Sequence, residues 1–327
     1  MKVCVGCFLL PLLLMFACSK KDAATSGTSV AADTAQATPP ASSQAVSPAN
    51  PSPPPAFDSG RAMKYVKEIV ALGPRPIGSE NHKKVENYIL THLKGLDTEQ
   101  DAFDIHPSEG TFPVTNIIAK FPGTKDGIIV IASHYETNWP LRNTSYIGAN
   151  DGASSSALLL EFANQLRGKK LDGYSVWLLW DDAEESMQLP WYDPESLYGV
   201  RHLADKWQAD GTLKKIKAFI LEDMIGDADL NILKDSNSSP WLEDLLYLAA
   251  TNLGYQSHFF GVQGPEIDDH LPFTQRGVPA IDIIDPVYGY NDVFHHTTED
   301  TVDKLSPKSL EIVGTVTLEM VRLLNQR

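Results

Sequence analysis

The sequence has no cysteine after residue 18. Its three cysteines, Cys4, Cys7 and Cys18, all lie close to the N-terminus of the 327-residue chain. The rest of the chain therefore excludes disulfide bonds, cysteine metal ligands and a cysteine nucleophile. Any metal ion held by that part needs histidine and carboxylate ligands.

Positively charged residues are also in short supply. The chain has 27 lysines and arginines against 42 aspartates and glutamates, a formal net charge of −15. This balance argues against nucleic acid or an anionic membrane surface as a main partner, because both repel an acidic protein. Solubility alone accounts for most of the charge, so we predict no nucleic-acid partner.

The apolar stretch at residues 3–18, VCVGCFLLPLLLMFAC, is short for a membrane span. It follows Lys2 and is typical of a secretory signal peptide. Its last four residues, Met15 to Cys18, resemble a bacterial lipobox, although the first position departs from the usual leucine. That resemblance implies lipidation of Cys18, and an ordinary signal cleavage nearby is the alternative.

We therefore predict a signal peptide over residues 1–18 and an exported protein, either a membrane-anchored bacterial lipoprotein or a periplasmic or secreted one. The membrane would be contacted only through the lipid anchor. Residues 19–57 are rich in alanine, serine, threonine and proline and lack large apolar residues, which predicts a disordered tether. Residues 58–327 then form the folded domain.

Hydrophobic periodicity in residues 58–327 predicts helices that alternate with strands. The predicted helices are 60–73, 82–96, 153–166, 196–208, 239–254 and 306–324, and the predicted strands are 115–123, 127–136, 175–185, 217–226 and 278–285. Several strands are apolar on both faces. This pattern predicts a single α/β domain with a central, twisted, mostly parallel or mixed sheet that helices cover on both sides.

Three of the predicted strands finish in polar residues. These residues are His134 to Glu136, Asp181 to Glu185, and Glu222 with Asp223, while two loops add Asp151 and the pair His295 and His296. Ligands of open α/β sheets bind outside the carboxyl ends of the strands. Each residue alone is more often a cap or an exposed side chain. Together they indicate a Zn²⁺ site, because zinc accepts histidine and carboxylate ligands and compensates clustered negative charge.

Residues 58–327 resemble the zinc-dependent M28 peptidase superfamily and, within it, the glutaminyl-peptide cyclotransferases (glutaminyl cyclases). The motifs SHYE, NDGAS, the EE pair and HT are shared across the superfamily. The stretches DPESLYGVRHLA and DDHLPF-x-x-RGVP are typical of the cyclase branch. The resemblance implies peptide or protein substrates with an N-terminal glutamine and one bound zinc ion.

The resemblance also implies roles for individual residues. The zinc ligands fall on Asp151, Glu185 and His296, and the catalytic acid/base falls on Glu184. Asp223 and Asp268 match two acids that cyclases use in a hydrogen-bond network around the substrate. Trp191 matches a tryptophan of the cyclase pocket, with a surface anchor of its loop as the alternative.

The cyclisation joins the α-amine of an N-terminal glutamine to its own side-chain carbonyl and expels ammonia. The carbonyl needs a Lewis acid, which zinc supplies. The amine loses a proton and the leaving ammonia gains one, so one carboxyl of raised pKa can serve both steps. We assign that role to Glu184, and we assign structural or supporting roles to Asp181 and Asp182.

Two departures from the cyclase pattern leave alternatives open. His295 stands where cyclases usually carry a tryptophan, so Phe294, Tyr288 or Tyr290 would have to complete an aromatic wall. His134 and Asp223 occupy the positions that M28 aminopeptidases use for a second zinc. A two-zinc aminopeptidase, in which Glu184 activates a metal-bound water, is therefore the main alternative, and an inactive binding module is a third. The cyclase stretches favour the first hypothesis.

Asp282 and Asp285 close the strand predicted at residues 278–285. We interpret them as strand-end caps, with a role in substrate choice as the alternative.

Overall fold

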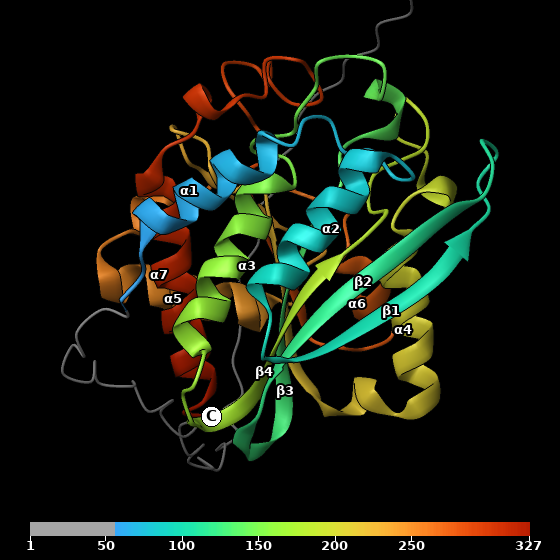
Figure 1. The fold of residues 1–327 in the computed structure, drawn as a ribbon. Coiled ribbons are helices and arrows are strands. Elements are labelled where there is room, and N and C mark those ends of the chain that lie inside the picture. Colours follow the sequence, from blue (N-terminus) through green and yellow to red (C-terminus); the bar gives the residue numbers. More distant parts are fainter. Residues whose placement is uncertain (1–55) are drawn as a thin grey trace, which may run out of the picture. The chain divides into compact units, whose positions relative to one another are not determined.

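The computed structural model describes residues 56–327, so the predictions for residues 1–18, for Cys18 and for nearly all of the tether fall outside the described residues. A six-stranded sheet runs in the order β1-β2-β4-β3-β5-β8 (Figure 1). Its strands are β1 Asp97–Ile105, β2 Phe112–Phe121, β3 Gly123–His134, β4 Leu171–Asp181, β5 Ile216–Asp223 and β8 Ala280–Ile284. A separate pair joins β6 Ile232–Asp235 to β7 Phe259–Gly264.

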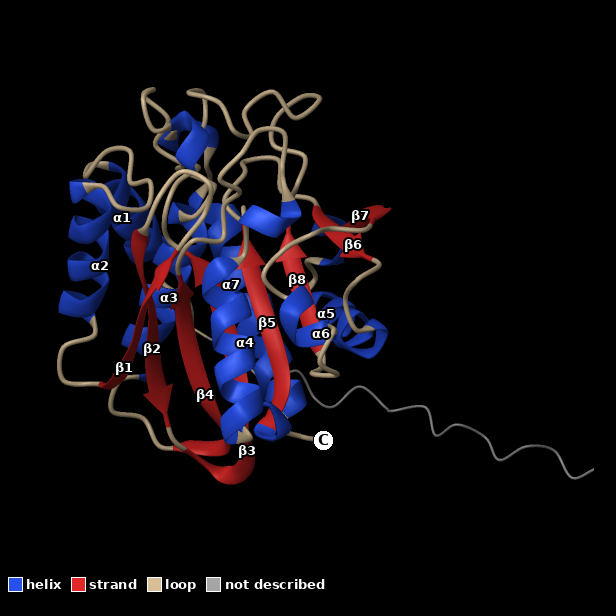
Figure 2. Cartoon of the chain, turned by 90° about the vertical axis from the view of Figure 1, so that its right-hand side faces the viewer, coloured by secondary structure: helices blue, strands red, loops and turns tan. Residues whose placement is uncertain are grey.

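The sheet is mixed. Strands β4, β3, β5 and β8 pair in parallel, whereas β2 runs antiparallel to both of its neighbours, β1 and β4. The parallel strands therefore all end at one edge of the sheet. Figure 2 shows that the loops beyond β5 and β8 gather at that edge.

Helices cover both faces of the sheet, as Figure 1 shows. The helices of one face are α1 Ser59–Val70, α2 Glu80–His92, α3 Ala153–Leu166, α5 Pro240–Leu253 and α7 Pro307–Leu324. The other face carries α4 Tyr198–Asp210 and the short α6 Leu271–Thr274. Single turns of 3₁₀ helix occur at Trp139–Leu141, Asp193–Glu195, Thr212–Lys215, Gln256–His258 and Val302–Lys304. This arrangement confirms the predicted α/β architecture.

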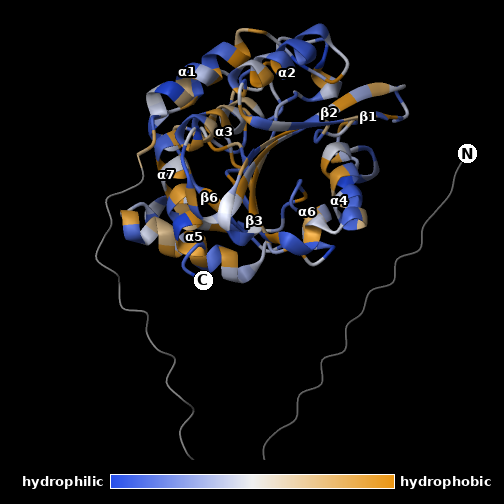
Figure 3. Ribbon diagram, turned by 60° about the horizontal axis from the view of Figure 1, so that its bottom comes forward, coloured by the Kyte–Doolittle hydropathy of each residue, from blue (hydrophilic) through white to orange (hydrophobic). Residues whose placement is uncertain are grey.

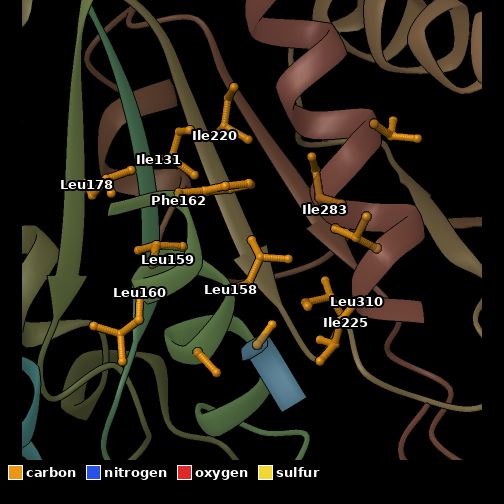
Figure 4. Packing of buried hydrophobic residues seen from close by; sticks show 14 of the residues in the cluster. Ile131, Leu158, Leu159, Leu160, Phe162, Leu178, Ile220, Ile225, Ile283 and Leu310 are labelled. Carbon is orange, nitrogen blue, oxygen red and sulfur yellow. The ribbon is translucent and has the colours of Figure 1, made fainter. Parts of the chain in front are cut away.

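The central strands are buried on both sides because their alternate residues enter two different cores. Ile131 of β3 belongs to the core under α3 and α7, whereas its neighbour Val130 packs toward α4. Figure 4 shows the first core, where strand residues such as Ile131 and Ile220 meet Phe162 of α3. Figure 3 shows hydrophobic residues along the central strands and hydrophilic residues on the outer side of α4. Burial of this kind contributes about 25 cal/mol for each Å² of apolar surface.

Local signals set the helix starts. Asp58 accepts a hydrogen bond from the Arg61 amide at 2.9 Å and caps α1, and Ser79 accepts one from the His82 amide at 3.0 Å and caps α2. Proline stands at the first position of α5 and α7, where its missing N–H costs nothing. Among residues 56–327, no helix is both long enough and apolar enough to cross a membrane.

Three strands were not predicted from the sequence. Strand β1 is the outermost strand of the sheet, and its residues DTEQDAFDI lack the alternation of a half-buried strand. Strands β6 and β7 are short and pair only with each other.

Candidate active site

The parallel strands bring the predicted acids together. His134 ends β3, Asp223 ends β5, and Glu184 and Glu185 follow β4 by three and four residues. In the register of β3 and β4, His134 pairs with Asp181. Neighbouring parallel strands thus deliver these side chains to one edge, as the sequence predicted.

Glu184 and Glu185 point in different directions because the chain turns just before them. Ala183 has a left-handed backbone with φ 59°. The turn is fixed by the Tyr198 amide, which donates to the Ala183 carbonyl at 2.8 Å. Glu185 Oε2 consequently lies 3.1 Å from His296 Nε2, whereas Glu184 Oε2 lies 3.9 Å from His134 Nδ1.

Asp151 lies between the two histidines. Its Oδ1 is 3.1 Å from His134 Nε2, and its Oδ2 is 3.3 Å from His296 Nε2. The Tyr146 hydroxyl donates to the same Oδ2. Asp300 Oδ2 accepts a hydrogen bond from the Asp151 backbone amide at 3.2 Å. Hydrogen bonds therefore hold both the side chain and the backbone of Asp151.

A buried arginine fixes this loop against β3. Arg75 is fully buried, and its guanidinium donates to the carbonyls of Tyr135 at 2.7 Å, Gly148 at 2.8 Å and Asp151 at 3.1 Å. Burial lowers the Arg75 pKa. Its planar set of donors suits several carbonyls at once, which a lysine ammonium could not match.

Three overlapping sets of side chains could hold a metal ion, each with ligand atoms within 4.8 Å of one another. They are His134 with Asp151 and Asp223, Asp151 with His295 and His296, and His134 with Glu136 and Glu184. His134 Nε2 is 3.2 Å from Asp223 Oδ1. Asp151 and His134 each belong to two of these sets.

The donor chemistry fits a divalent cation. Glu185 Oε1 and His134 Nδ1 are buried and have no hydrogen-bond partner within residues 56–327. Burial lowers the His296 pKa, but the carboxylates of Glu185 and Asp151 outweigh it and raise the value to about 11. The cluster therefore attracts positive charge strongly, and a zinc ion could provide it.

Glu184 lines a cavity of about 690 Å³. Burial raises the Glu184 pKa well above the usual value; His134 opposes the rise, and Asp268 adds to it. Burial and the charge of Asp223 likewise raise the pKa of Asp268. A raised pKa makes a carboxylate a stronger base, which suits general acid–base chemistry.

All predicted catalytic residues, zinc ligands and the pocket tryptophan line this cavity, namely Asp151, Glu184, Glu185, Trp191, Asp223, Asp268 and His296. His134 lies behind it, almost fully buried against Asp151 and Asp223. His295 also lines the cavity, at the position where cyclases usually carry a tryptophan. Its Nδ1 is 3.4 Å from Asp292 Oδ2.

Asp181 and Asp182 have different surroundings. Asp182 Oδ1 is 2.7 Å from His82 Nε2, and its Oδ2 accepts the Thr115 amide at 2.8 Å, so it ties α2 and β2 to the end of β4. Asp181 is fully buried next to Asp269. Burial raises the Asp181 pKa to about 6.

Sequence reasoning assigned no role to several residues that support the site. They are Arg75, Asn138, Tyr146 and Asp300, of which Asn138 donates to Glu185 Oε2 at 2.7 Å. Three of them lie in the motifs GPRPIG, YIGANDGAS and FHHTTEDT, but only the tertiary contacts show what they hold. A buried His270 was also missed. Its Nε2 is 3.1 Å from Asp235 Oδ2 and its Nδ1 is 3.9 Å from Asp282 Oδ2, so the imidazole lies between two carboxylates.

Comparisons with known proteins agree with this geometry. The model of peptidase family M28 matches residues 116–321. A glutaminyl-peptide cyclotransferase of Drosophila melanogaster is 30% identical over 240 residues, which cover 65% of this chain and 67% of that protein. The crystal structure of an Acidobacteriales bacterium glutaminyl cyclase is similar with a TM-score of 0.83 at 48% identity, over 86% of this chain and 100% of that one.

A second kind of enzyme shares the fold. The structure of a Zn-dependent exopeptidase from Parabacteroides distasonis is similar with a TM-score of 0.73 at 25% identity, over 84% of this chain and 99% of that one. The chain is thus similar to members of both branches, with the higher identity on the cyclase side.

Proposed function

This chain belongs to peptidase family M28, and we propose that it is a glutaminyl-peptide cyclotransferase that converts the N-terminal glutamine of peptides or proteins to pyroglutamate. The observation that carries the proposal is the 48% identity to a solved glutaminyl cyclase, over 86% of the chain. The cavity supports it, because Glu184, Asp268 and Trp191 line one space with the zinc-ligand set.

In the proposed site, Asp151, Glu185 and His296 would hold one zinc ion, which would supply a Lewis acid for the side-chain carbonyl of the glutamine. Glu184 accepts a proton from the attacking α-amine. A carbon–nitrogen bond forms to that amine, the bond to the side-chain nitrogen breaks, and Glu184 returns the proton to the departing ammonia. One carboxyl can serve both transfers, and burial raises the Glu184 pKa, which makes its carboxylate a stronger base than that of an ordinary glutamate.

Asp268 and Asp223 support Glu184 and the substrate. Both line the cavity beside Glu184, and Asp268 Oδ2 has no hydrogen-bond partner within the described residues. That atom is free to accept a hydrogen bond from the substrate amine. Trp191 forms a wall of the cavity, and His295 takes the position of the usual tryptophan.

The second candidate function is a two-zinc aminopeptidase, and one observation favours it. His134 Nε2 lies within 3.2 Å of carboxylate oxygens of both Asp151 and Asp223, so a second set of ligands is already assembled. In that enzyme Glu184 would activate a water molecule instead of the substrate amine.

Product identity separates the two candidates. The purified protein, loaded with zinc, is incubated with a peptide that begins with glutamine, and the products are identified by mass spectrometry. The proposed function predicts one peptide product that has lost ammonia. Free glutamine together with a shortened peptide would support the aminopeptidase and contradict the cyclase. A peptide with asparagine in place of the first glutamine is the control and should remain unchanged.

We also propose that the protein is exported and anchored through a lipid on Cys18, on the grounds of the apolar stretch at residues 3–18 and of its last four residues, Met15 to Cys18. Expression of the full chain in a bacterium, followed by membrane fractionation, tests this. The wild-type protein should sediment with membranes and incorporate labelled fatty acid, and Cys18→Ala should lose both properties. Unlabelled protein that is released in both cases would contradict the anchor.

A further inference from the structure

A second cavity, of about 1020 Å³, shares a wall with the first. The wall is the segment 284–296, which follows β8. Its residues Ile284, Pro286, Asp292, His295 and His296 line the first cavity. The residues between them, Asp285, Val287, Gly289, Tyr290, Asn291 and Phe294, line the second. A peptide whose first residue occupies the first cavity therefore has the second one next to it.

The second cavity is acidic. Asp227, Asp229, Asp285 and Asp303 line it. Its lining residues include one lysine, Lys304, whose Nζ is 2.6 Å from Asp303 Oδ2, so these two charges offset each other. Three aspartates then remain without a compensating lysine or arginine in the lining. Such a surface attracts cations, most strongly at low salt.

Asp285 carries a second, independent sign of a ligand. Its side chain is 1% exposed, and Oδ2 accepts the Asn231 amide at 2.7 Å. Its Oδ1 is buried and has no hydrogen-bond partner within residues 56–327. Burial, with added repulsion from Asp227 and Asp229, raises the Asp285 pKa to about 7. A cationic ligand would supply the missing partner of Oδ1 and would offset part of the free-energy cost of burying the Asp285 carboxylate.

The rim of the second cavity is apolar. Tyr290 is 84% exposed, Val287 45% and Val262 40%. Such surfaces suit the aliphatic part of a lysine or arginine side chain, and the exposed ring of Tyr290 can also face a cation. Large exposed aromatic residues of this kind are typical of binding surfaces.

On the basis of the proposed function, we propose that the second cavity binds the residues that follow the N-terminal glutamine, and that it selects substrates with a lysine or arginine among them. The specificity then has two parts. The first cavity binds the N-terminal glutamine. The cavity lined by Asp227, Asp229 and Asp285 binds a positively charged side chain farther along the substrate peptide.

Matched peptides test this inference. Each begins with glutamine, is otherwise neutral, and carries a single lysine or a single glutamate at the third, fourth, fifth or sixth position. Ammonia release gives kcat/KM for each peptide at low and at high salt. We expect kcat/KM of the lysine peptide to exceed that of its glutamate partner by about tenfold at one or more positions, through KM, because the three aspartates attract a lysine and repel a glutamate. Added salt should reduce the ratio.

Variants locate the effect. Asp229 is exposed, so Asp229→Asn should fold normally and should lower the ratio of kcat/KM between lysine and glutamate peptides about threefold. Asp126→Asn removes the same charge near the start of β3, at the opposite end of the strand from the site, and should leave the preference intact. If the Tyr290 ring contacts only the peptide chain, Tyr290→Ala should lower kcat/KM equally for lysine and glutamate peptides. If the ring faces the positive charge, kcat/KM should fall more for the lysine peptides.

Three outcomes would overturn the inference. One is equal kcat/KM for every lysine and glutamate pair on an enzyme that cyclises both. The second is a loss of preference in Asp126→Asn as large as that in Asp229→Asn, which would assign the effect to overall charge. The third is a Tyr290→Ala variant that changes none of the peptides. No ammonia release from any of them would instead contradict the proposed function.

Discussion

At the scale of single residues, the adjacent pair Glu184 and Glu185 has divided roles. The left-handed turn at Ala183 sends Glu185 toward His296 and Glu184 toward His134 and the cavity. A left-handed alanine costs about 1–3 kcal/mol, and such strain persists where the surrounding structure fixes it. The hydrogen bonds from Tyr198 and Leu197 to the carbonyls of this turn do so here.

The divided roles predict different results for two conservative substitutions. Glu184→Gln should retain zinc and lose cyclase activity by about 10²–10⁴-fold, since an amide cannot transfer the proton. Glu185→Gln should instead weaken zinc binding, because a charged ligand is lost. Metal analysis after dialysis, together with ammonia release, separates the two variants. Loss of zinc in Glu184→Gln, with zinc retained in Glu185→Gln, would show that the roles are exchanged.

The sequence was sufficient to predict the acids at the strand ends. A strand's apolar run and the polar residues after it are local features, and parallel strands bring their ends together whatever the loops do. Arg75 and Asp300 could not be predicted in the same way. They act on Asp151 across 76 and 149 residues of sequence, and only the folded loop brings them into contact.

At the scale of structural elements, the turn from Asp151 into α3 positions Asp151, one of the proposed zinc ligands. Gly152 has φ +80°, and a Cβ placed on it would lie 2.8 Å from the Glu136 carbonyl oxygen and 2.9 Å from His134 Cε1. A side chain there would displace either the loop or the histidine. The glycine is therefore needed for both its backbone conformation and its lack of volume.

Gly152→Ala should lower stability by about 1–3 kcal/mol and weaken zinc binding at the same time. The matched control is Gly168→Ala, just beyond the other end of α3. Gly168 has φ +72°, but an added Cβ there has nothing within 4 Å. Gly168→Ala should lower the free energy of unfolding without changing the affinity for zinc. Isothermal titration with zinc and urea unfolding measure the two effects, and equal zinc affinity in both variants would contradict the assignment.

Helix α7 packs against β5 through a buried carboxyl. Glu222 is fully buried, and the Thr317 hydroxyl donates to its Oε1 at 2.6 Å. Burial raises the Glu222 pKa from 4.5 to about 8, and the hydrogen bond from Thr317 opposes part of that rise. Because the folded state holds this proton more tightly than the unfolded state, stability falls as pH rises from the unfolded value through the folded one.

Glu222→Gln should therefore flatten the decline of unfolding free energy between about pH 5 and 8, where the wild type loses a few kcal/mol to deprotonation of this group. Urea unfolding at a series of pH values measures the slope. Thr317→Val is the control, since it removes the hydroxyl and keeps the titrating carboxyl, and it should retain the decline. An unchanged slope in Glu222→Gln would assign the pH dependence to other groups.

Element boundaries were predictable where the pattern was strong. Strands β3, β4, β5 and β8 have apolar runs that enter two cores, which a sequence pattern can indicate. Strand β1 has none, because it pairs only with β2 at the edge of the sheet and stays largely exposed. Its position is determined by pairing with β2, which the propensities of its own residues do not predict.

At the scale of the whole molecule, the excess of negative charge has a local focus. Buried carboxyls gather around the first cavity, and three aspartates without a lysine or arginine partner in the lining mark the second. The formal net charge of −15 would by itself indicate only solubility. In our proposals, the negative charge of the first cavity binds a metal ion, and that of the second cavity binds a cationic substrate.

The central claim is that one zinc ion suffices for cyclisation. The metal-free protein is titrated with zinc while the products from one glutamine-initiated peptide are quantified by mass spectrometry. We predict that the cyclised peptide increases up to one zinc per chain and then levels off, with no shortened peptide at any ratio. A shortened peptide that appears only as a second zinc binds would contradict the claim and identify the protein as a two-zinc aminopeptidase.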